Sequence, residues 1–174
     1  MSGTEYQNIA LVRLSSIGDV IFAMPALAVL RQRFPNSKIS WIVEDRAADL
    51  LADHPLLDEV IVMPRRQWKK KRAGGASRLD VLSDMRRFGR SLRDRKFDLV
   101  IDFQGNIKSG LITRATKAPL RIGFSRGETK EPNWLFTNKH LDLKGEVMHR
   151  MERDIRLLEL IGVQESFVWP PFQY

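Results

Sequence analysis

Two hydroxyls, a glycine and a carboxylate follow the first apolar segment of the sequence, in the order Ser15-Ser16-Ile17-Gly18-Asp19. A carboxylate that faces a cleft can act as a general base and take a proton from a hydroxyl nucleophile. In the first turn of a helix, the same carboxylate can instead cap free backbone N–H groups. The segment has neither the GxGxxG nor the GxxxxGK[ST] pattern, so it predicts neither a dinucleotide site nor a P-loop. Both roles of Asp19 stay open at this point.

A strongly basic segment follows the apolar residues 60–63. Its sequence, RRQWKKKR over 65–72, contains six basic side chains and one tryptophan. Arginine forks bind carboxylates and phosphates through paired hydrogen bonds, so this segment is a candidate for binding an anionic ligand. A solvated charge run, stacking of nucleic-acid bases on the tryptophan, and contact with anionic lipid are the alternatives.

Two further polar segments contain candidate site residues. The turn DFQGNIKS over 102–109 contains Gln104, which is either a ligand contact or a structural hydrogen-bonding group, and Lys108. Lys130 lies in an irregular region, where functional loops concentrate. His149 lies in a segment expected to be helical, where a packed or capping histidine is the default interpretation.

The elements that must position these residues alternate between strand and helix. Apolar runs typical of strands in a parallel sheet occupy residues 8–14, 38–43, 60–63, 99–101 and 121–124. Helices are expected over residues 20–34, 46–52, 79–92, 107–115 and 146–161, the last ending at Gly162. Irregular structure is expected over residues 65–77, 125–144 and the proline-rich tail 167–174.

The helix expected over 79–92 is amphipathic. Apolar residues recur along it every three or four positions, with arginines between them: Leu79, Leu82, Met85, Phe88 and Leu92. This spacing predicts one apolar stripe, which packs on the core and leaves the arginines outside.

The alternation of elements predicts an α/β fold, a Rossmann-like doubly wound parallel sheet with right-handed connections, in one domain over 1–174. Ligands of such sheets bind beyond the carboxyl ends of the strands. The 15–19 loop, the acidic pair at 44–45, the start of the basic segment and Gln104 all fall at those ends. This convergence is the main functional indication in the residues themselves.

Composition restricts the classes of protein and site. The 174 residues include 29 Lys and Arg against 21 Asp and Glu, a net charge of +8 that favours an anionic partner. There is no cysteine, which excludes disulfides, thiol catalysis and cysteine-based zinc sites, and the three histidines lack metal-ligand spacing. No apolar run approaches the ~18–20 residues of a membrane span, and the polar N-terminus does not resemble a signal peptide. The expectation is a soluble, cytoplasmic protein without a bound metal or cofactor.

In combination, the segments resemble the amino-terminal half of the lipopolysaccharide heptosyltransferases of glycosyltransferase family 9, over about Asn8 to Val163. The motifs that carry the resemblance are, in order, LSSIGDVIFAMPAL, WIVED, RRQWKK, FDLVIDFQGNIKSG, IGF with KEP downstream, and HRMER. The RRxWK, DxQGxxKS and KEP segments look most like the heptosyltransferase I branch, which adds the first heptose to the Kdo sugar of the inner core.

The resemblance implies a GT-B architecture, in which two Rossmann-like domains face each other across a cleft. This chain would be the domain that binds the acceptor, Kdo-lipid A or a related lipopolysaccharide. ADP-heptose would bind to a carboxyl-terminal domain absent from this chain, so the fragment alone would be inactive. The resemblance also allows peripheral contact with the anionic inner face of the inner membrane, and it implies no nucleic-acid partner.

The resemblance also implies roles for individual residues. Asp19 would be the catalytic base of an inverting transfer. Arg65, Arg66 and Lys69 would bind the anionic acceptor, and Lys130 stands where related enzymes have arginine, which keeps the charge but loses the bidentate fork. Further cleft residues on the acceptor side would be Ser15, Ser16, Gly18, Gln104 and Lys108.

Two other functions remain as alternatives. One is a heptosyltransferase of type II or III, which would use a different acceptor. The other is a basic nucleic-acid-binding module, although the sequence lacks helix-turn-helix, RNP and zinc-finger patterns.

Overall fold

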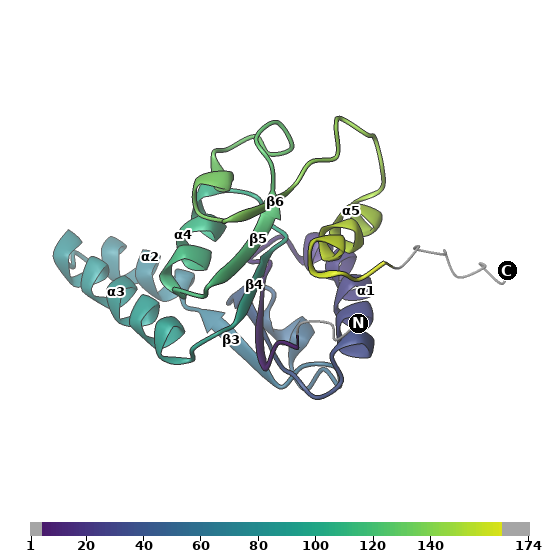
Figure 1. Ribbon diagram of the computed structural model, residues 1–174. Coiled ribbons are helices and arrows are strands. Elements are labelled where there is room, and N and C mark those ends of the chain that lie inside the picture. The colour runs from purple at the N-terminus through teal and green to yellow at the C-terminus, as the bar shows by residue number, and fades with distance from the viewer. Residues whose placement is uncertain (1–4, 165–174) are drawn as a thin grey trace, which may run out of the picture.

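A computed structural model describes residues 5–164 of the chain. Six parallel strands form one sheet in the order β3-β2-β1-β4-β5-β6 (Figure 1). The strands are β1 Asn8–Val12, β2 Lys38–Glu44, β3 Glu59–Met63, β4 Leu99–Asp102, β5 Leu120–Phe124 and β6 Lys139–Leu141. The strand order reverses direction between β1 and β4, so a topological switch point lies there. The predicted doubly wound parallel sheet is confirmed.

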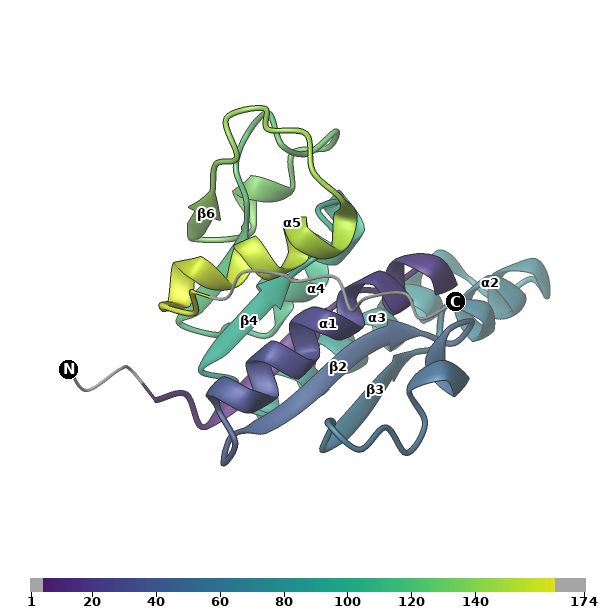
Figure 2. The same ribbon diagram turned by 90° about the vertical axis from the view of Figure 1, so that its right-hand side faces the viewer.

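Helices cover both faces of this sheet (Figures 1 and 2). One face carries α1 Ile17–Arg33 and α5 Arg150–Leu157, which lie side by side. The other face carries α3 Arg78–Asp94 and α4 Ile107–Ala115, and α2 Arg65–Ala73 forms a hairpin with α3. Three short 3-10 helices complete the described part: Ala48–Leu51, Asn133–Leu135 and Leu158–Ile161.

Two hydrophobic clusters form the core, one on each face of the sheet. Because side chains alternate along a strand, Ile9 and Leu11 of β1 enter the cluster under α1 and α5, whereas Ala10 and Val12 enter the cluster under α3 and α4. All four side chains are fully buried. The central strand therefore contributes to both layers, and the loop that follows it is attached to a strand that is buried on both faces.

The structure corrects the expectation that residues 65–77 are irregular, because most of them form α2. Arginine, lysine and glutamine have good helix propensity, and Trp68 gives the helix one buried side chain. The expected irregular region 125–144 also contains the edge strand β6, whose three residues are too few and too polar to be predicted from an apolar run.

Other boundaries shift by a few residues. Within the expected helix 46–52, Ala48–Leu51 form a short 3-10 helix, and the last helix begins at Arg150 rather than at residue 146. His149 is the N-cap of that helix, where its Nδ1 accepts a hydrogen bond from the N–H of Met151, so the capping interpretation of His149 is confirmed. Gly162 ends the helical segment with a φ of +80°, as predicted. The proline-rich tail 167–174 lies outside the described residues.

The apolar stripe of α3 packs on the core only in its second half. Leu92 is buried, and Phe88 is partly buried against Trp68. Leu79, Leu82 and Met85 are 74%, 40% and 46% exposed. The expectation of one buried stripe is therefore wrong for the first half of the helix, which extends away from the sheet together with α2 (Figure 1).

No helix within residues 5–164 is both long enough and apolar enough to cross a membrane.

Candidate functional site at the carboxyl edge of the sheet

The loop between β1 and α1 is held by a side chain from the neighbouring strand. The Oε1 atom of Gln104, just beyond β4, accepts hydrogen bonds from the backbone N–H groups of Leu14 (3.1 Å) and Ser15 (3.2 Å). These contacts cross the switch point of the sheet. Of the two roles considered for Gln104, the structural one is therefore present, and it fixes the position of the Ser15–Asp19 segment.

Asp19 lies in the first turn of α1 and uses both carboxylate oxygens. Its Oδ2 accepts hydrogen bonds from the N–H (3.1 Å) and the hydroxyl (3.2 Å) of Ser16, the N-cap residue. Its Oδ1 forms an ion pair with Arg150, at the start of α5. The carboxylate side chain is 17% exposed and Arg150 is 61% exposed. Asp19 therefore caps the helix, and its Oδ1 is paired with an arginine that is largely exposed at the surface.

A buried carboxylate supports the turn that carries Gln104. Asp102, at the end of β4, is fully buried and accepts hydrogen bonds from the N–H groups of Gln104 (3.0 Å) and Gly105 (3.1 Å). The amide of Asn133 donates a further bond at 2.8 Å. Burial raises the pKa of Asp102 above its ordinary value, although the bonds from Asn133 and the backbone oppose the shift. Asp102 has a positioning role here and does not face a cleft.

Glu44, at the end of β2, binds two of the predicted anion-binding cations. Its side chain is 2% exposed, lies 3.1 Å from the Nη1 atom of Arg65 through each oxygen, and forms an ion pair with Lys108. Burial alone raises the pKa of Glu44, but the hydrogen bonds and charges of Lys108 and Arg65 outweigh burial and leave the pKa below its ordinary value. Two cations share one anion, so this cluster retains a net positive charge.

The other predicted cations are more open to solvent. The N–H of Arg66 donates to Asp45 at 2.7 Å, whereas its guanidinium is 67% exposed and 3.9 Å from the same carboxylate. Lys69 and Lys130 are exposed, and neither forms an ion pair with a residue in 5–164. The loop of Lys130 is fixed to the start of α4, because the Oε2 of Glu131 accepts a hydrogen bond from the N–H of Ile107 at 2.8 Å.

A buried ion pair under α5 was not predicted from the sequence. Arg13, directly after β1, pairs with Asp154, and the two side chains are 6% and 1% exposed. Burial raises the pKa of Asp154 to about 6, although the neighbouring arginines oppose the shift. Next to this pair, the guanidinium of Arg153 lies 3.7 Å from the ring centroid of Phe124. An arginine inside the otherwise apolar segment 8–14 was the available signal for a buried partner, since such a charge is rarely buried unpaired.

An apolar pocket of about 260 Å³ lies beside the Glu44 cluster, between α2, α3 and α4. Arg65 and Lys108 border it, and its apolar wall includes Trp68, Phe88 and Leu111. Within residues 5–164, no three His, Asp or Glu side chains lie close enough together to hold a metal ion. The edge thus combines hydroxyls, one accessible carboxylate and surplus cations, a set suited to binding an anionic molecule that carries hydroxyl groups.

Comparison with known proteins shows the family of this chain. The sequence profile of glycosyltransferase family 9 (heptosyltransferase) matches residues 85–172, which is half of the chain. The chain belongs to glycosyltransferase family 9. Lipopolysaccharide heptosyltransferase 1 of Pseudomonas aeruginosa is 35% identical over 130 residues, and the protein of the same name from Escherichia coli K12 is 28% identical over 148 residues.

Solved structures of the family share the fold of this chain. Escherichia coli heptosyltransferase WaaC, solved with ADP-2-deoxy-2-fluoro heptose, superposes with a TM-score of 0.80 at 27% identity, over 94% of this chain and 51% of WaaC. Escherichia coli heptosyltransferase II superposes with a TM-score of 0.65 at 22% identity, which shows the fold alone. The alignment with the Pseudomonas relative covers 72% of this chain and 34% of the relative. The alignment with the Escherichia coli K12 relative covers 84% of this chain and 44% of the relative. The chain therefore spans between a third and a half of these relatives.

The structure joins the predicted site residues into two adjoining groups. The 15–19 segment and Gln104 form one, and Arg65, Arg66 and Lys108 form the other around the acidic pair at 44–45. The N–H of Glu44 donates to the carbonyl of Leu14 at 3.0 Å, so the groups lie on neighbouring strands. Lys69 and Lys130 lie outside both groups. Arg150 belongs to the HRMER motif but was not predicted as a site residue, and it comes from a segment more than 130 positions after Asp19.

Proposed function

We propose that this chain is the acceptor-binding half of an inverting glycosyltransferase that moves heptose from ADP-heptose to the Kdo inner core of lipopolysaccharide. The names of the relatives support the reaction class and the heptose donor. On this proposal residues 1–174 form a single acceptor-binding domain, and a carboxyl-terminal domain outside this chain binds the nucleotide sugar. The chain by itself would then bind acceptor and turn over no donor.

The observation that carries the proposal is the position of Asp19. Its carboxylate lies at the switch point of a parallel sheet, where ligands of this fold class bind. Within residues 5–164, its Oδ1 has one ion-pair partner, the 61% exposed Arg150. The other groups at this edge complement an anionic sugar. Ser15, Ser16 and Gly18 offer hydroxyl and backbone groups, and the surplus charge around Glu44 attracts carboxylates and phosphates.

The chemistry follows from a carboxylate that can accept a proton. Arg150 leaves Oδ1, and an acceptor hydroxyl takes its place beside Asp19. The hydroxyl oxygen attacks the anomeric carbon of heptose from the face opposite the leaving group, and the bond from that carbon to the β-phosphate oxygen of ADP breaks. The hydroxyl proton passes to Asp19 and ADP leaves with the electron pair of the broken bond. The configuration at the anomeric carbon is thereby inverted.

The acceptor-binding cations have different roles in this proposal. Arg66, Lys69 and Lys130 are exposed, so they can contact the acceptor without losing a buried partner. Arg65 and Lys108 already bind Glu44, so they set the local potential and the shape of the site. Removal of Arg65 or Lys108 is therefore expected to affect folding as well as binding, whereas removal of Arg66 affects binding alone.

A heptosyltransferase of type 2 or 3 is the second candidate. Lipopolysaccharide heptosyltransferase 2 of Salmonella typhimurium is 28% identical over 123 residues, and heptosyltransferase 3 of Escherichia coli K12 is 22% identical over 158 residues. These types would differ in the acceptor. Titration of the chain with a Kdo disaccharide and with a heptose-capped core oligosaccharide separates them, because the proposal requires tighter binding of the Kdo disaccharide.

The decisive experiment replaces Asp19 by asparagine in a two-domain enzyme that has this chain as its amino-terminal half. Asparagine also caps helices well, so folding should be retained. The loss of the base should lower kcat by about 10²–10⁴-fold, measured as ADP release with saturating acceptor. Asp19→Ala should show the same loss of kcat and a further destabilisation of about 1 kcal/mol.

The chain provides a matched control in α3. Asp80 accepts bonds from the N–H (3.2 Å) and the hydroxyl (2.9 Å) of Ser77, the same arrangement that Asp19 makes with Ser16. Asp80→Asn should leave kcat unchanged. If Asp19→Asn is as silent as Asp80→Asn, Asp19 is only a helix cap and the base assignment is wrong.

A further inference from the structure

The outer side of α3 carries a continuous line of leucine and arginine side chains. Its members lie three or four positions apart, which places them on one side of the helix, and are here called the outer stripe: Leu79, Leu82, Arg86, Arg90 and Arg93. The buried Leu92 and the partly buried Phe88 define the opposite, inward side. The outer stripe is distinct from the candidate site, since none of its members contacts the 15–19 segment or Glu44.

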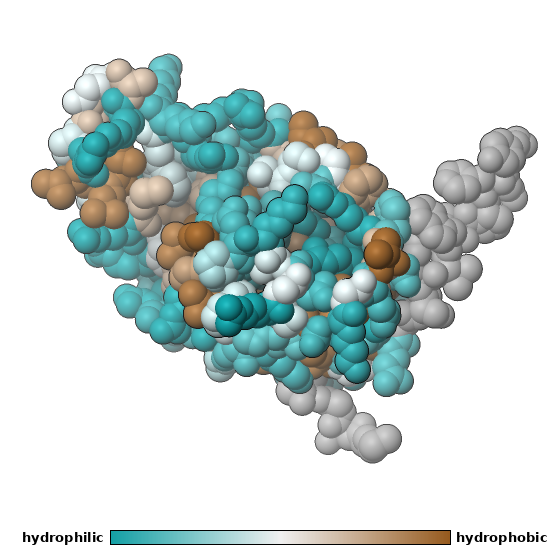
Figure 3. Space-filling view, turned by 90° about the horizontal axis from the view of Figure 1, so that it is seen from above, coloured by the Kyte–Doolittle hydropathy of each residue, from teal (hydrophilic) through white to brown (hydrophobic). Residues whose placement is uncertain are grey.

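The outer stripe is open to solvent. Leu79 is 74% exposed and Leu82 is 40% exposed, and the two leucines lie about one helical turn apart on the same side of α3. The three arginines are also exposed, and none of them forms an ion pair within residues 5–164. Seen from the carboxyl edge of the sheet, the end of the molecule over α2 and α3 has hydrophobic side chains among hydrophilic ones (Figure 3).

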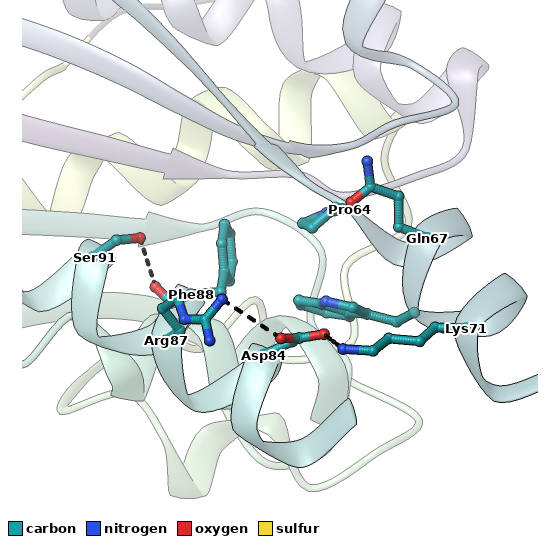
Figure 4. Close-up of a pocket in the computed structure, with 8 residues that line it drawn as sticks. Pro64, Gln67, Lys71, Asp84, Arg87, Phe88 and Ser91 are labelled. Carbon is teal, nitrogen blue, oxygen red and sulfur yellow. Dashed lines mark hydrogen bonds and ion pairs between the residues drawn. The ribbon is translucent and has the colours of Figure 1, made fainter. Parts of the chain in front are cut away.

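The hairpin of α2 and α3 contains the whole net charge of the chain. Residues 65–94 include eleven Lys and Arg against three Asp, a net charge of +8, while acids and bases balance in the rest of the sequence. Two of the three carboxylates are already engaged. Asp80 caps α3, and Asp84 points into the groove between the two helices, 2.6 Å from Lys71 and 3.7 Å from Arg87 (Figure 4). The third, Asp94, is the last residue of the helix, beyond Arg93.

We propose that the outer stripe binds the surface of a bilayer that contains anionic lipid, with α3 lying in the plane of the interface. Exposed leucines bury themselves at the boundary between head groups and acyl chains, and arginines on the same side bind lipid phosphates. A polyanion such as nucleic acid would use the arginines but would leave Leu79 and Leu82 in water. The two leucines in the cationic line therefore favour a lipid surface.

The proposal goes beyond heptose transfer and does not depend on it. Because α2 begins two residues after the end of β3, the hairpin extends from the same edge of the sheet as the candidate site. A bound α3 would hold that edge near the bilayer. The residues to be changed in the test lie outside the proposed acceptor and base groups, so a failure here leaves the proposed function intact.

The test is co-sedimentation of the 174-residue chain with vesicles. Vesicles of phosphatidylcholine with about one third phosphatidylglycerol should bind the chain, and vesicles of phosphatidylcholine alone should not. Replacement of Arg86, Arg90 and Arg93 by glutamine should weaken binding roughly 100-fold, because each cation near an anionic surface contributes a factor of about five. Replacement of Leu79 and Leu82 by serine should weaken it roughly tenfold or more.

The matched control removes the same charge elsewhere. Arg33, Arg114 and Lys117 are exposed and lie outside the hairpin, so their replacement by glutamine should weaken vesicle binding by less than about fivefold. Equal losses in the control and in the arginine variant would overturn the proposal, since net charge alone would then explain binding. The proposal also fails if the leucine variant binds vesicles as tightly as the unchanged chain. It fails as well if short duplex DNA displaces the chain from vesicles and binds the unchanged chain and the leucine variant equally.

Discussion

The two faces of the sheet differ in how much apolar surface they bury. The cluster under α1 and α5 has 24 buried hydrophobic residues, and the cluster under α2, α3 and α4 has 11. The face covered by α1 and α5 is here called the thick face, and the face covered by α2, α3 and α4 the thin face. The thin face exposes Leu79 and Leu82, whereas Leu27 and Leu30 of the thick face are fully buried. Most of the hydrophobic stabilisation therefore comes from one face, and the other can present charge and apolar side chains outward.

The polar groups divide in the same way. On the α1 and α5 side there are two ion pairs. Asp19 of α1 pairs with Arg150 of α5, and Arg13, directly after β1, pairs with Asp154 of α5. On the α2 and α4 side, Glu44 joins Arg65 and Lys108. The proposed base therefore lies on the thick face, and the anion-binding cations lie on the thin face.

The comparison is tested most strongly by one leucine from each face. Leu27→Ala removes a fully buried side chain of α1 and should lower the free energy of unfolding by about 2.5–5 kcal/mol. Leu82→Ala removes an exposed side chain of α3 and should change it by less than about 0.5 kcal/mol. Urea unfolding followed by circular dichroism measures both. A loss above about 2 kcal/mol for Leu82→Ala would mean that the first half of α3 is covered in solution.

Local patterns predicted most of the fold. Five of the six strands, α1, α3, α4 and the end at Gly162 follow from apolar runs, helical spacing and a glycine, because buried parallel strands are continuous apolar segments. β6 was missed because three residues, two of them exposed, carry no such pattern. α2 was missed because its basic residues have no apolar period, and Trp68 alone provides its buried face.

The candidate site was predictable only in outline. Polar residues at strand ends indicated the right edge of the sheet, and Gln104 was correctly considered as a structural residue. The partners were not predictable, since Glu44 with Lys108, Arg13 with Asp154 and Asp19 with Arg150 join segments 64 to 141 positions apart. Pairing over such distances depends on the order of strands and the placement of α5, which spacing along the sequence does not contain.

A smaller effect concerns pH and the buried carboxylate of the thick face. Burial raises the pKa of Asp154 to about 6 from its ordinary value of 3.8, so between these values the folded state holds a proton that the unfolded state has released. Stability from this group therefore falls as pH rises through that window. Asp154→Asn does not titrate there, so the free energy of unfolding of the unchanged chain minus that of the variant should increase by about 1 kcal/mol from pH 7 to pH 5.

Urea unfolding of both proteins at pH 5, 6 and 7 measures this difference. Glu44, whose pKa is lowered, makes the opposite contribution, which is lost as pH falls below its unfolded value. The contribution of Glu44 is present in the unchanged chain and in Asp154→Asn, so it cancels in the difference between their free energies of unfolding. A difference that stays constant or decreases toward pH 5 would show that Arg13 keeps Asp154 ionised and that burial does not dominate.

The smallest expected effect concerns the ion pair of Asp19 with Arg150, at the surface of the thick face. Arg150→Gln removes the partner of Asp19, but the arginine is 61% exposed, and exposed ion pairs contribute about 0–1 kcal/mol to stability. Arg87→Gln, which removes a 78% exposed partner of Asp84 on the thin face, is the matched control. Both should change the free energy of unfolding by less than about 1 kcal/mol, so the difference between the faces should vanish at the surface.

The same variant separates two roles of Arg150 in a two-domain enzyme that contains this chain. If Arg150 only covers Asp19 until the acceptor arrives, Arg150→Gln should keep kcat within about threefold of the unchanged enzyme, far from the loss of about 10²–10⁴-fold expected for Asp19→Asn. A loss of kcat as large as that of Asp19→Asn, with stability retained, would place Arg150 among the residues that hold Asp19 in its reactive position. The thick face would then contribute two residues to the reaction, and α5 would be part of the active site as well as of the core.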